Sequence, residues 1–365
     1  MPSSAEVHIN VAPKGGNKSS PRTLTCRRII GCDGINSKVR EILATKVSRS
    51  FRTKSVRCPS ANLIFRSIMA PNPKQVSFND FVSFRGQTGN SISMLSFHDT
   101  VAGGDGCRNL RPLSMARRPN YFLYRCKTVD EVYDALEKEF PQLDAKINIS
   151  REAIEAFLHS EGVTFPKPTW TRRAACVIKG VPIILVGDSL HHFPPDVGQG
   201  LNAGLLDAAH VLHTEDGIKR QHSNMTDAEL ANAMKSYSKE RVKEAESMCR
   251  LISVANPYYQ YNLRNPIDRL GKSIFTAQRA VESKLFRASE RMSKALGMPN
   301  IMMRPSVTAL LMKSNPTLSY KDILRQHRQN LLVTSGIALS FALVMCKLLG
   351  LDVAKFLMRR FVMKR

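Results

Sequence analysis

The chain has 365 residues, of which 43% are hydrophobic and 23% charged, a globular composition that excludes disordered, collagen-like and low-complexity classes. Its 54 lysines and arginines exceed its 30 aspartates and glutamates, so the formal net charge at pH 7 is +24. This excess favours an anionic partner, such as a nucleic acid, an acidic membrane surface or an anionic cofactor. The length predicts two domains, or one large domain with an extension.

The first half of the chain is predicted to be rich in β-strands. Alternating apolar residues predict a strand at 7–11, and a second strand is expected at 23–30. Short apolar runs separated by Pro, Gly and Asn then predict an antiparallel sheet, with strands at 61–69, 76–84, 91–97 and 121–124. Helices are expected at 129–140 and 151–161.

The second half begins with a strand and is otherwise helical. The segment 177–186 predicts a strand, and its run 183–186 is apolar on both faces, which is typical of a buried parallel strand. From Thr226 onward the pattern is helical, with amphipathic segments at 230–253 and 267–296.

An apolar segment lies near the C-terminus. Residues 331–346 carry no formal charge, and after Lys347 the apolar run continues to residue 350. About 20 apolar residues span a bilayer, and a terminal lysine can reach the interface. With basic residues on both flanks, 331–350 predicts a transmembrane helix, and a buried core helix is the alternative.

The first of two motifs follows the strand that ends at Gly31. Asp33 is flanked by glycines, and a helix is expected to begin after Ser37 and to include Arg40. Glycines such as Gly34 let the backbone approach a ligand, and a helix N-terminus favours anions. The Asp33 carboxylate can accept hydrogen bonds from sugar hydroxyls, although an isolated Asp-Gly after a strand is most often a turn.

The second motif follows the apolar run 183–186. Gly187 and Asp188 come first, then Pro195, and a helix is expected to begin at about Leu201. The carboxyl end of a parallel strand is where α/β sheets place ligands, so Asp188 is a candidate binding residue. The backbone N–H groups around the start of the helix would face an anion or an electron-rich oxygen. The remaining candidates in this segment are Gly198, Gln199, Gly200 and Asn202.

Together the two motifs resemble the "DG" and "GD" motifs of FAD-dependent aromatic monooxygenases, and the sequence looks most like the kynurenine 3-monooxygenase group of that family. The resemblance covers roughly residues 20–250 and is specific at the motifs, Gly31–Arg40 and Gly187–Ala208. It implies an α/β, Rossmann-like FAD-binding domain, incomplete at the N-terminus, with an antiparallel β-sheet substrate domain, a helical C-terminal region and a C-terminal transmembrane helix. The implied ranges are 1–50 and 171–225 for the FAD-binding domain, 51–170 for the substrate domain, 226–325 for the helical region and 331–350 for the membrane helix.

The resemblance also implies roles for the motif residues. Asp188 would bind the ribityl chain of FAD, and the N–H groups from Gly198 to Leu201 would stabilise charge on the reduced flavin. Pro195 and Asn202 would lie beside the ring. Asp33 and Arg40 would help to hold FAD and admit NAD(P)H. No catalytic side chain is assigned, because bound FAD supplies the chemistry and the protein supplies position and a dry pocket.

Two departures from the family pattern leave alternatives open. The family begins with a GxGxxG unit that binds the FAD pyrophosphate, and no such motif precedes Gly31 here. Asp196 lies in a stretch that is more apolar in the family, which puts kynurenine itself in doubt. The sequence therefore predicts hydroxylation of a small aromatic substrate with NAD(P)H and O₂. The alternatives are a truncated, catalytically impaired homologue, or another FAD-dependent oxidoreductase such as an epoxidase.

The partners follow from the same patterns. We expect FAD, NAD(P)H, O₂ and a small aromatic substrate, and attachment of the C-terminal helix to the mitochondrial outer membrane or another intracellular membrane. The basic residues are dispersed among glutamates, and no zinc spacing or aromatic RNA-binding string is present, so no nucleic-acid partner is expected. The eight cysteines include no pair with two-residue spacing, so no metal site is expected.

Overall fold

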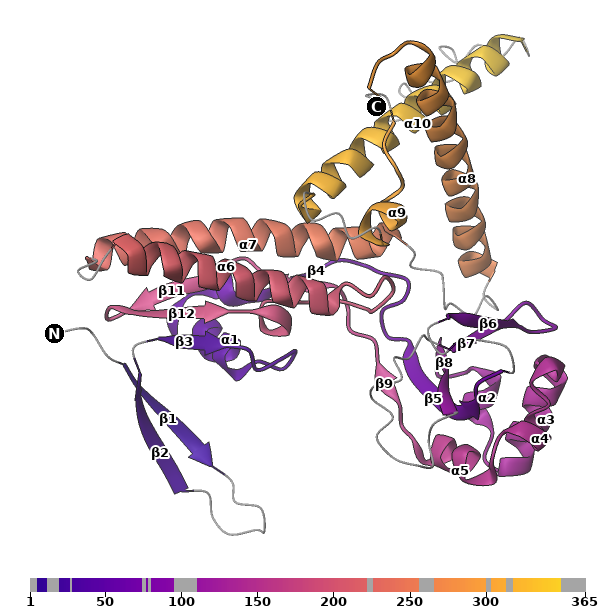
Figure 1. The fold of residues 1–365 in the computed structure, drawn as a ribbon, viewed down its shortest axis with the longest axis horizontal. Helices are drawn as coiled ribbons and strands as arrows, with labels where there is room; N and C mark the ends of the chain where they lie inside the picture. The colour runs from indigo at the N-terminus through magenta and orange to yellow at the C-terminus, as the bar shows by residue number, and fades with distance from the viewer. Residues whose placement is uncertain are drawn as a thin grey trace, which may run out of the picture. The chain divides into compact units, whose positions relative to one another are not determined.

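A computed structural model describes residues 5–11, 20–26, 28–73, 77, 80–94, 110–221, 226–255, 266–299, 303–312 and 318–348. The chain divides into two compact units, Met1–Arg264 and Asn265–Arg365. Figure 1 traces the course of the chain through its helices and strands. The two units are described separately below.

A three-stranded sheet at the centre of the first unit has the order β11 (Ala175–Ile178), β12 (Val181–Leu185), β3 (Ile29–Gly31). β12 is parallel to β3, which confirms the parallel strand predicted from the run 183–186. The predicted single strand 177–186 is instead a hairpin. Lys179 and Gly180 both have positive φ (48° and 77°), and these angles form the tight turn that makes β11 and β12 antiparallel.

Two long helices, α6 (Gly200–Gln221) and α7 (Asp227–Ala255), contact one another and run side by side along this sheet (Figure 1). α7 also contacts β11 and β12, and it buries Met234, Tyr237 and Met248. The predicted strand 23–30 is divided between β2 (Ser20–Cys26), which forms a hairpin with β1 (Ala5–Val11), and β3.

A five-stranded antiparallel sheet confirms the predicted β-rich segment. Its order is β6 (Val82–Arg85), β7 (Ser91–Met94), β8 (Leu110–Arg117), β5 (Ile64–Pro71), β9 (Val163–Thr164). Residues 95–97 of the predicted strand 91–97 lie outside the described residues. The helices of this region are α2 (Phe122–Arg125), α3 (Val129–Glu139), η4 (Pro141–Leu143), α4 (Ala145–Asn148) and α5 (Arg151–His159).

The helices and the five-stranded sheet share one core. Ile68, Leu113, Leu136 and Phe157 are almost fully buried in it. The strand predicted at 121–124 is wrong, because those aromatic residues form the helical turn α2, in which the Tyr124 N–H donates to the Tyr121 carbonyl at 3.0 Å. Aromatic residues favour strands only weakly, and here packing against the sheet decides the conformation.

A small sheet joins these two regions. Its order is β13 (His191–His192), β10 (Thr169–Thr171), β4 (Thr53–Ser55), and all of its pairs are antiparallel. It connects the segment after β12 to the chain that leads into β5. Short helical turns complete the unit: α1 (Lys38–Ile42), η1 (Leu43–Val47), η2 (Arg49–Phe51) and η5 (Gly187–Ser189).

The second unit is helical, with α8 (Pro266–Ala295), α9 (Val307–Met312) and α10 (Tyr320–Leu348). α10 contacts both α8 and α9. The Asn330 side chain fixes the segment before α9, because it accepts a hydrogen bond from the Arg304 N–H and donates one to the Arg304 carbonyl, each at 2.9 Å.

The predicted transmembrane helix 331–350 is wrong. Among the residues that the structure describes, no helix combines the length and the apolar character that crossing a bilayer requires. The apolar residues belong to α10, which begins at Tyr320, and its first turns carry Lys321, Asp322 and Arg325. Residues 349 and 350 lie outside the described part of the chain. The predicted membrane attachment and single-pass localisation depended on this helix, so the structure does not support them either.

Candidate functional site

The carboxyl ends of β3 and β12 meet at one edge of the central sheet. Leu185 pairs with Gly31, and the Val186 N–H donates to the Gly31 carbonyl at 3.1 Å. A Cβ added at Gly31 would lie 3.0 Å from the Leu185 side chain and 3.1 Å from that of Val39, so a larger residue would require these side chains to shift by a few tenths of an ångström. The two sequence motifs therefore begin side by side.

The Asp33 carboxylate caps the short helix that follows β3. Its Oδ2 accepts hydrogen bonds from the backbone N–H groups of Lys38 (2.6 Å) and Val39 (3.1 Å), while Ser37 Oγ accepts one from the Arg40 N–H at 2.9 Å. Burial opposes ionisation of Asp33, but these N–H groups and the Ser37 hydroxyl lower its pKa below the ordinary value. Asp33 is therefore an anion that stabilises the start of α1.

Arg40 connects the two motifs. Its guanidinium donates to the backbone carbonyls of Ile35, Asp188 (3.3 Å) and Ser189 (2.9 Å). The Ser189 hydroxyl in turn donates to the Gly31 carbonyl. The first motif thus holds the backbone that presents Asp188.

The second motif forms an open loop ahead of α6. Gly187 has a φ of +60°, and a Cβ there would lie 3.9 Å from the Gly204 Cα, so the loop passes close to the helix. The Asp188 side chain is exposed, and its carboxylate has no hydrogen-bond or ion-pair partner in the described part of the chain. Asp188 is therefore free to bind a ligand.

A turn leads from this loop into the helix. The Gly198 N–H donates to the Pro195 carbonyl at 3.2 Å, and Gly198 has a φ of +64°. A Cβ added at Gly198 or Gly200 would meet no atom within 4 Å, so both glycines face open space. The first N–H groups of α6, from Gly200 to Asn202, have no intrahelical partner. Within the described part of the chain, the turn therefore presents unpaired N–H donors beside an open surface.

Three buried side chains, Asp207, His191 and Arg241, support this loop. The Asp207 carboxylate accepts hydrogen bonds from the Gly187 N–H (2.9 Å), His191 Nε2 (2.8 Å) and Arg241 Nε (2.8 Å). Burial opposes its ionisation, but the His191 hydrogen bond and charge, the Arg241 charge and the Gly187 N–H lower the Asp207 pKa below its ordinary value. Since Arg241 belongs to α7, the trio joins α6, α7 and the strand-end loop.

A second carboxylate of the same loop faces the region that precedes β5. Ser60 Oγ donates to Asp196 Oδ2, and Ser60 Oγ lies 3.1 Å from Cys58 Sγ. Burial raises the pKa of Asp196 to about 6, and the Ser60 hydrogen bond only partly offsets this effect. Asp196 therefore titrates close to neutral pH.

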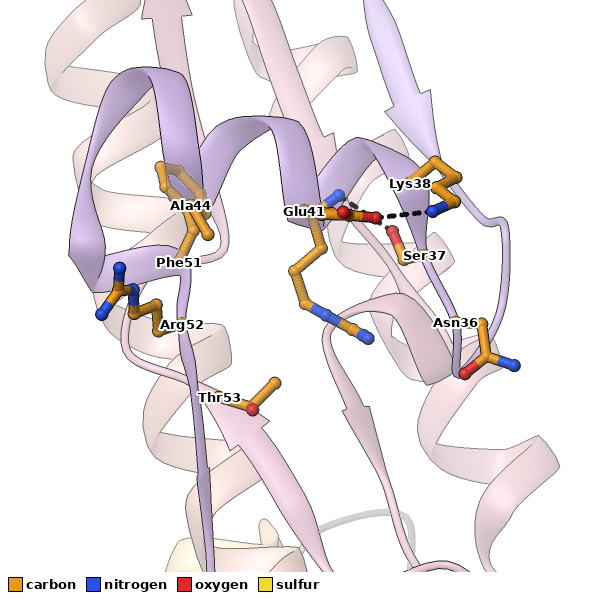
Figure 2. A pocket seen from close by; sticks show the side chains of 9 residues that line it. Asn36, Ser37, Lys38, Glu41, Ala44, Phe51, Arg52 and Thr53 are labelled. Carbon is orange, nitrogen blue, oxygen red and sulfur yellow. Dashed lines mark hydrogen bonds and ion pairs between the residues drawn. The ribbon is translucent and has the colours of Figure 1, made fainter.

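A pocket of about 690 Å³ lies along α1 and the chain that follows it. Its charged lining residues are Lys38, Arg40, Glu41 and Arg52, so cations predominate. Figure 2 shows Asn36, Ser37 and Lys38 toward one end and Phe51 and Arg52 toward the other, with Lys38 and Glu41 joined by an ion pair of 2.7 Å. The pocket shares Arg40 with the strand-end site and suits an anionic group.

The structure brings the predicted site residues together in two groups. Asp33, Gly34, Arg40, Gly187 and Asp188 lie at the strand ends. The remaining predicted residues form the turn and the first turn of α6: Pro195, Gly198, Gln199, Gly200, Leu201 and Asn202.

Sequence reasoning did not identify Arg241 or Ser60. Arg241 is 3% exposed although it lies in a helix with many charged residues. Its burial depends on its pairing with Asp207, which the sequence pattern does not reveal. Ser60 follows a Cys-Pro dipeptide, and nothing in that pattern points to Asp196. Both partners are distant in sequence.

Comparisons with known proteins identify the family of this chain. The model of the FAD binding domain family matches residues 5–249, well over half of the 365 residues. The chain is 22% identical over 258 residues to FAD-dependent monooxygenase olcE of Penicillium canescens. The matched segment covers 63% of this chain and 49% of that protein. It is 29% identical over 156 residues to kynurenine 3-monooxygenase of Cryptococcus neoformans var. neoformans. This match covers 40% of this chain and 29% of that protein. The chain therefore spans half or less of the length of these curated relatives.

Some solved structures resemble the chain at lower identity. Klebsiella pneumoniae HpxO, solved with FAD and uric acid, is 15% identical with a TM-score of 0.41, and the match covers 70% of this chain and 56% of that one. BexE is 16% identical with a TM-score of 0.42, covering 75% and 47%. On the family match, which includes both strand-end motifs and the α6 loop, this chain belongs to the FAD binding domain family.

Proposed function

We propose that the chain is an FAD-dependent monooxygenase that hydroxylates a small aromatic substrate with NAD(P)H and O₂, in the manner of kynurenine 3-monooxygenase. The observation that carries this proposal is the loop from Gly187 to Gly200, where a carboxylate and N–H groups that have no partner among the described residues border an open surface. The printed names of the two curated relatives, both monooxygenases, point to the same activity.

The residues present fit the flavin. Gly198 and Gly200 leave space where any side chain would project, so a flat ring can lie against the backbone. The Asp188 carboxylate is exposed and unpaired among the described residues, so it can accept hydrogen bonds from the hydroxyls of a ribityl chain. Both features match the roles expected for FAD.

Bound FAD would accept reducing equivalents from NAD(P)H and deliver oxygen from O₂ to the substrate. The N–H groups of Gly200, Leu201 and Asn202 would stabilise negative charge on the bound ring, because they form the positive end of α6. Arg40 and the cations of the α1 pocket would hold phosphate groups of a dinucleotide. The five-stranded sheet, whose β5 follows the Ser60 segment, would supply the substrate side.

Flavin binding gives the direct test of this proposal. We expect purified protein to bind FAD, and NAD(P)H oxidation to rise when a suitable aromatic compound is added. Gly200→Leu would fill the open space, whereas Gly336→Leu places the same side chain on α10, where a Cβ also meets no atom within 4 Å. We expect at least about tenfold weaker FAD binding for the first variant and no change for the second.

The outcomes separate the alternatives. Equal FAD binding by both variants, or no flavin uptake by the unaltered protein, contradicts the proposal. Flavin binding without NAD(P)H oxidation favours a catalytically impaired homologue. NAD(P)H oxidation that aromatic compounds do not stimulate favours another FAD-dependent oxidoreductase, such as an epoxidase.

A further inference from the structure

Helix α8 of the second unit (Figure 1) carries large apolar residues on an exposed side. Leu270, Ile274, Val281 and Met292 are each 48–62% exposed. They are separated by 4, 7 and 11 residues, and at 3.6 residues per turn these intervals return to the same side of a helix. These four residues form an apolar stripe that extends for about 33 Å along α8, at 1.5 Å per residue.

The side of α8 that packs within the second unit is a different one. Glu282 and Ser289 lie there and are 3% and 5% exposed. Glu282 accepts hydrogen bonds from Gln278 (3.0 Å) and Arg279 (2.8 Å). Burial lowers the pKa of His327 on α10, and the charges of Arg279 and Glu282 act on it in opposite directions, so this side of α8 faces α10. The apolar stripe is therefore not the surface that joins these two helices.

Three exposed cations, Lys284, Arg287 and Arg291, form a row beside the apolar stripe. Their spacing of 3 and 4 residues places them on one side of the helix. None of them makes an ion pair within the described part of the chain, and Arg287 donates to Ser283 Oγ at 3.1 Å. α8 contains seven lysines and arginines but three acidic residues, so the helix does not neutralise this cation row. A partner that covers the stripe should therefore bring negative charge to its border.

This pattern distinguishes between three possible occupants. A second copy of α8 would bring its own Lys284 and Arg291 to the border, and like charges would repel. A helix that lies in a bilayer surface places aromatic residues on its lipid side. Phe275 and Phe286 of α8 are instead half-buried and lie outside the stripe. The charges and the aromatic residues thus favour an acidic protein over both alternatives.

Small residues alternate with the large ones along the stripe. Ala277 and Ala288 are exposed and lie between the larger side chains, where they leave gaps that the side chains of a facing helix can fill. We propose that the apolar stripe of α8 binds an acidic amphipathic helix of a partner protein, whose carboxylates pair with the cation row. This binding uses no residue of the flavin site, so it does not depend on the proposed function.

The test uses the full chain and two fluorescently labelled synthetic helical peptides that share one leucine seam. One peptide carries glutamates beside the seam and the other carries lysines at the same positions. We expect the acidic peptide to bind at least about tenfold more tightly by fluorescence anisotropy, and this difference to shrink as salt is added. The double variant with Lys284→Glu and Arg291→Glu should instead prefer the basic peptide.

Two substitutions on α8 provide the control for the stripe. Ile274→Asn should weaken binding of the acidic peptide at least about tenfold. Thr276→Asn adds the same side chain at an exposed position on another side of the helix, so it should leave binding unchanged. Circular dichroism confirms that each variant keeps its helical content.

Equal binding of the two peptides overturns the inference, as does a preference that the double variant does not reverse. Sedimentation velocity and flotation with phosphatidylserine vesicles examine the other occupants. A dimer of the chain, or binding to the vesicles, would also overturn it if Ile274→Asn abolishes that association, because the stripe would then serve a second copy or a lipid surface.

Discussion

Asp196→Asn should stabilise the flavin-free protein above pH 6. Burial raises the Asp196 pKa from 3.8 to about 6, so ionising the carboxyl costs more in the folded than in the unfolded chain. Asparagine keeps the shape and can accept the Ser60 hydrogen bond, but it carries no charge. The variant therefore avoids the cost of a half-buried anion whose partner is a neutral hydroxyl.

The magnitude follows from the shift in pKa. A rise of about two units corresponds to about 3 kcal/mol at most, at 1.36 kcal/mol per unit. Between pH 4 and pH 6 the folded state binds more protons than the unfolded state, so stability falls as the pH rises through this window. Because Asp196 is only half-buried, we expect a gain of about 1–3 kcal/mol at pH 8 and almost none at pH 4.

Urea denaturation of both proteins at pH 4, 6 and 8 measures the difference, because groups that titrate alike in both proteins cancel. A variant that is less stable than the unaltered protein at pH 8 would refute the reasoning. A stability difference that does not depend on pH would also refute it, since it would arise from packing and not from the charge.

Three further substitutions test the rest of the site. Asp207→Asn leaves Arg241 buried without its counter-charge and should cost about 3–5 kcal/mol, seen as a lower melting temperature. Asp188→Ala should leave the urea midpoint unchanged and weaken FAD binding about 10- to 100-fold, measured by flavin fluorescence. Gly187→Ala places a Cβ on a residue with a φ of +60° and should lower the free energy of unfolding by about 1–2 kcal/mol. Urea denaturation measures this loss, and an unchanged free energy of unfolding would contradict it.

The two motifs were predictable because their chemistry is local in the sequence. A buried strand that ends in glycine and aspartate specifies a strand end, an open backbone and a carboxylate within a few residues, and the parallel pairing of β3 with β12 then brings Asp33 and Asp188 to one edge. Arg40 lies within the first motif, but its bonds to the Asp188 and Ser189 carbonyls depend on that pairing. Residue types were therefore predictable, and most contacts were not.

The C-terminal helix shows why composition alone misled. The uncharged run that begins at Leu331 has the residues of a membrane segment, but hydropathy within a fixed window takes no account of what precedes it. The structure extends the helix back to Tyr320, where His327 and Asn330 are 5% and 2% exposed. These polar side chains pack within the second unit, and Asn330 makes two backbone hydrogen bonds there. An apolar run that continues a packed polar helix can serve as part of that helix.

The first three carboxylates after β12 are Asp188, Asp196 and Asp207, and residue type alone does not distinguish their environments. Asp207 is fully buried and satisfied by His191, Arg241 and a backbone N–H, so its charge is used in holding the fold. Asp188 is exposed and unpaired among the described residues, so its charge is available at no cost in stability. Asp196 is half-buried with one hydroxyl partner, so its charge destabilises the folded state. The three carboxylates therefore differ in what their charge costs the folded state: nothing for the exposed Asp188, most for Asp196, and an amount that His191 and Arg241 offset for Asp207.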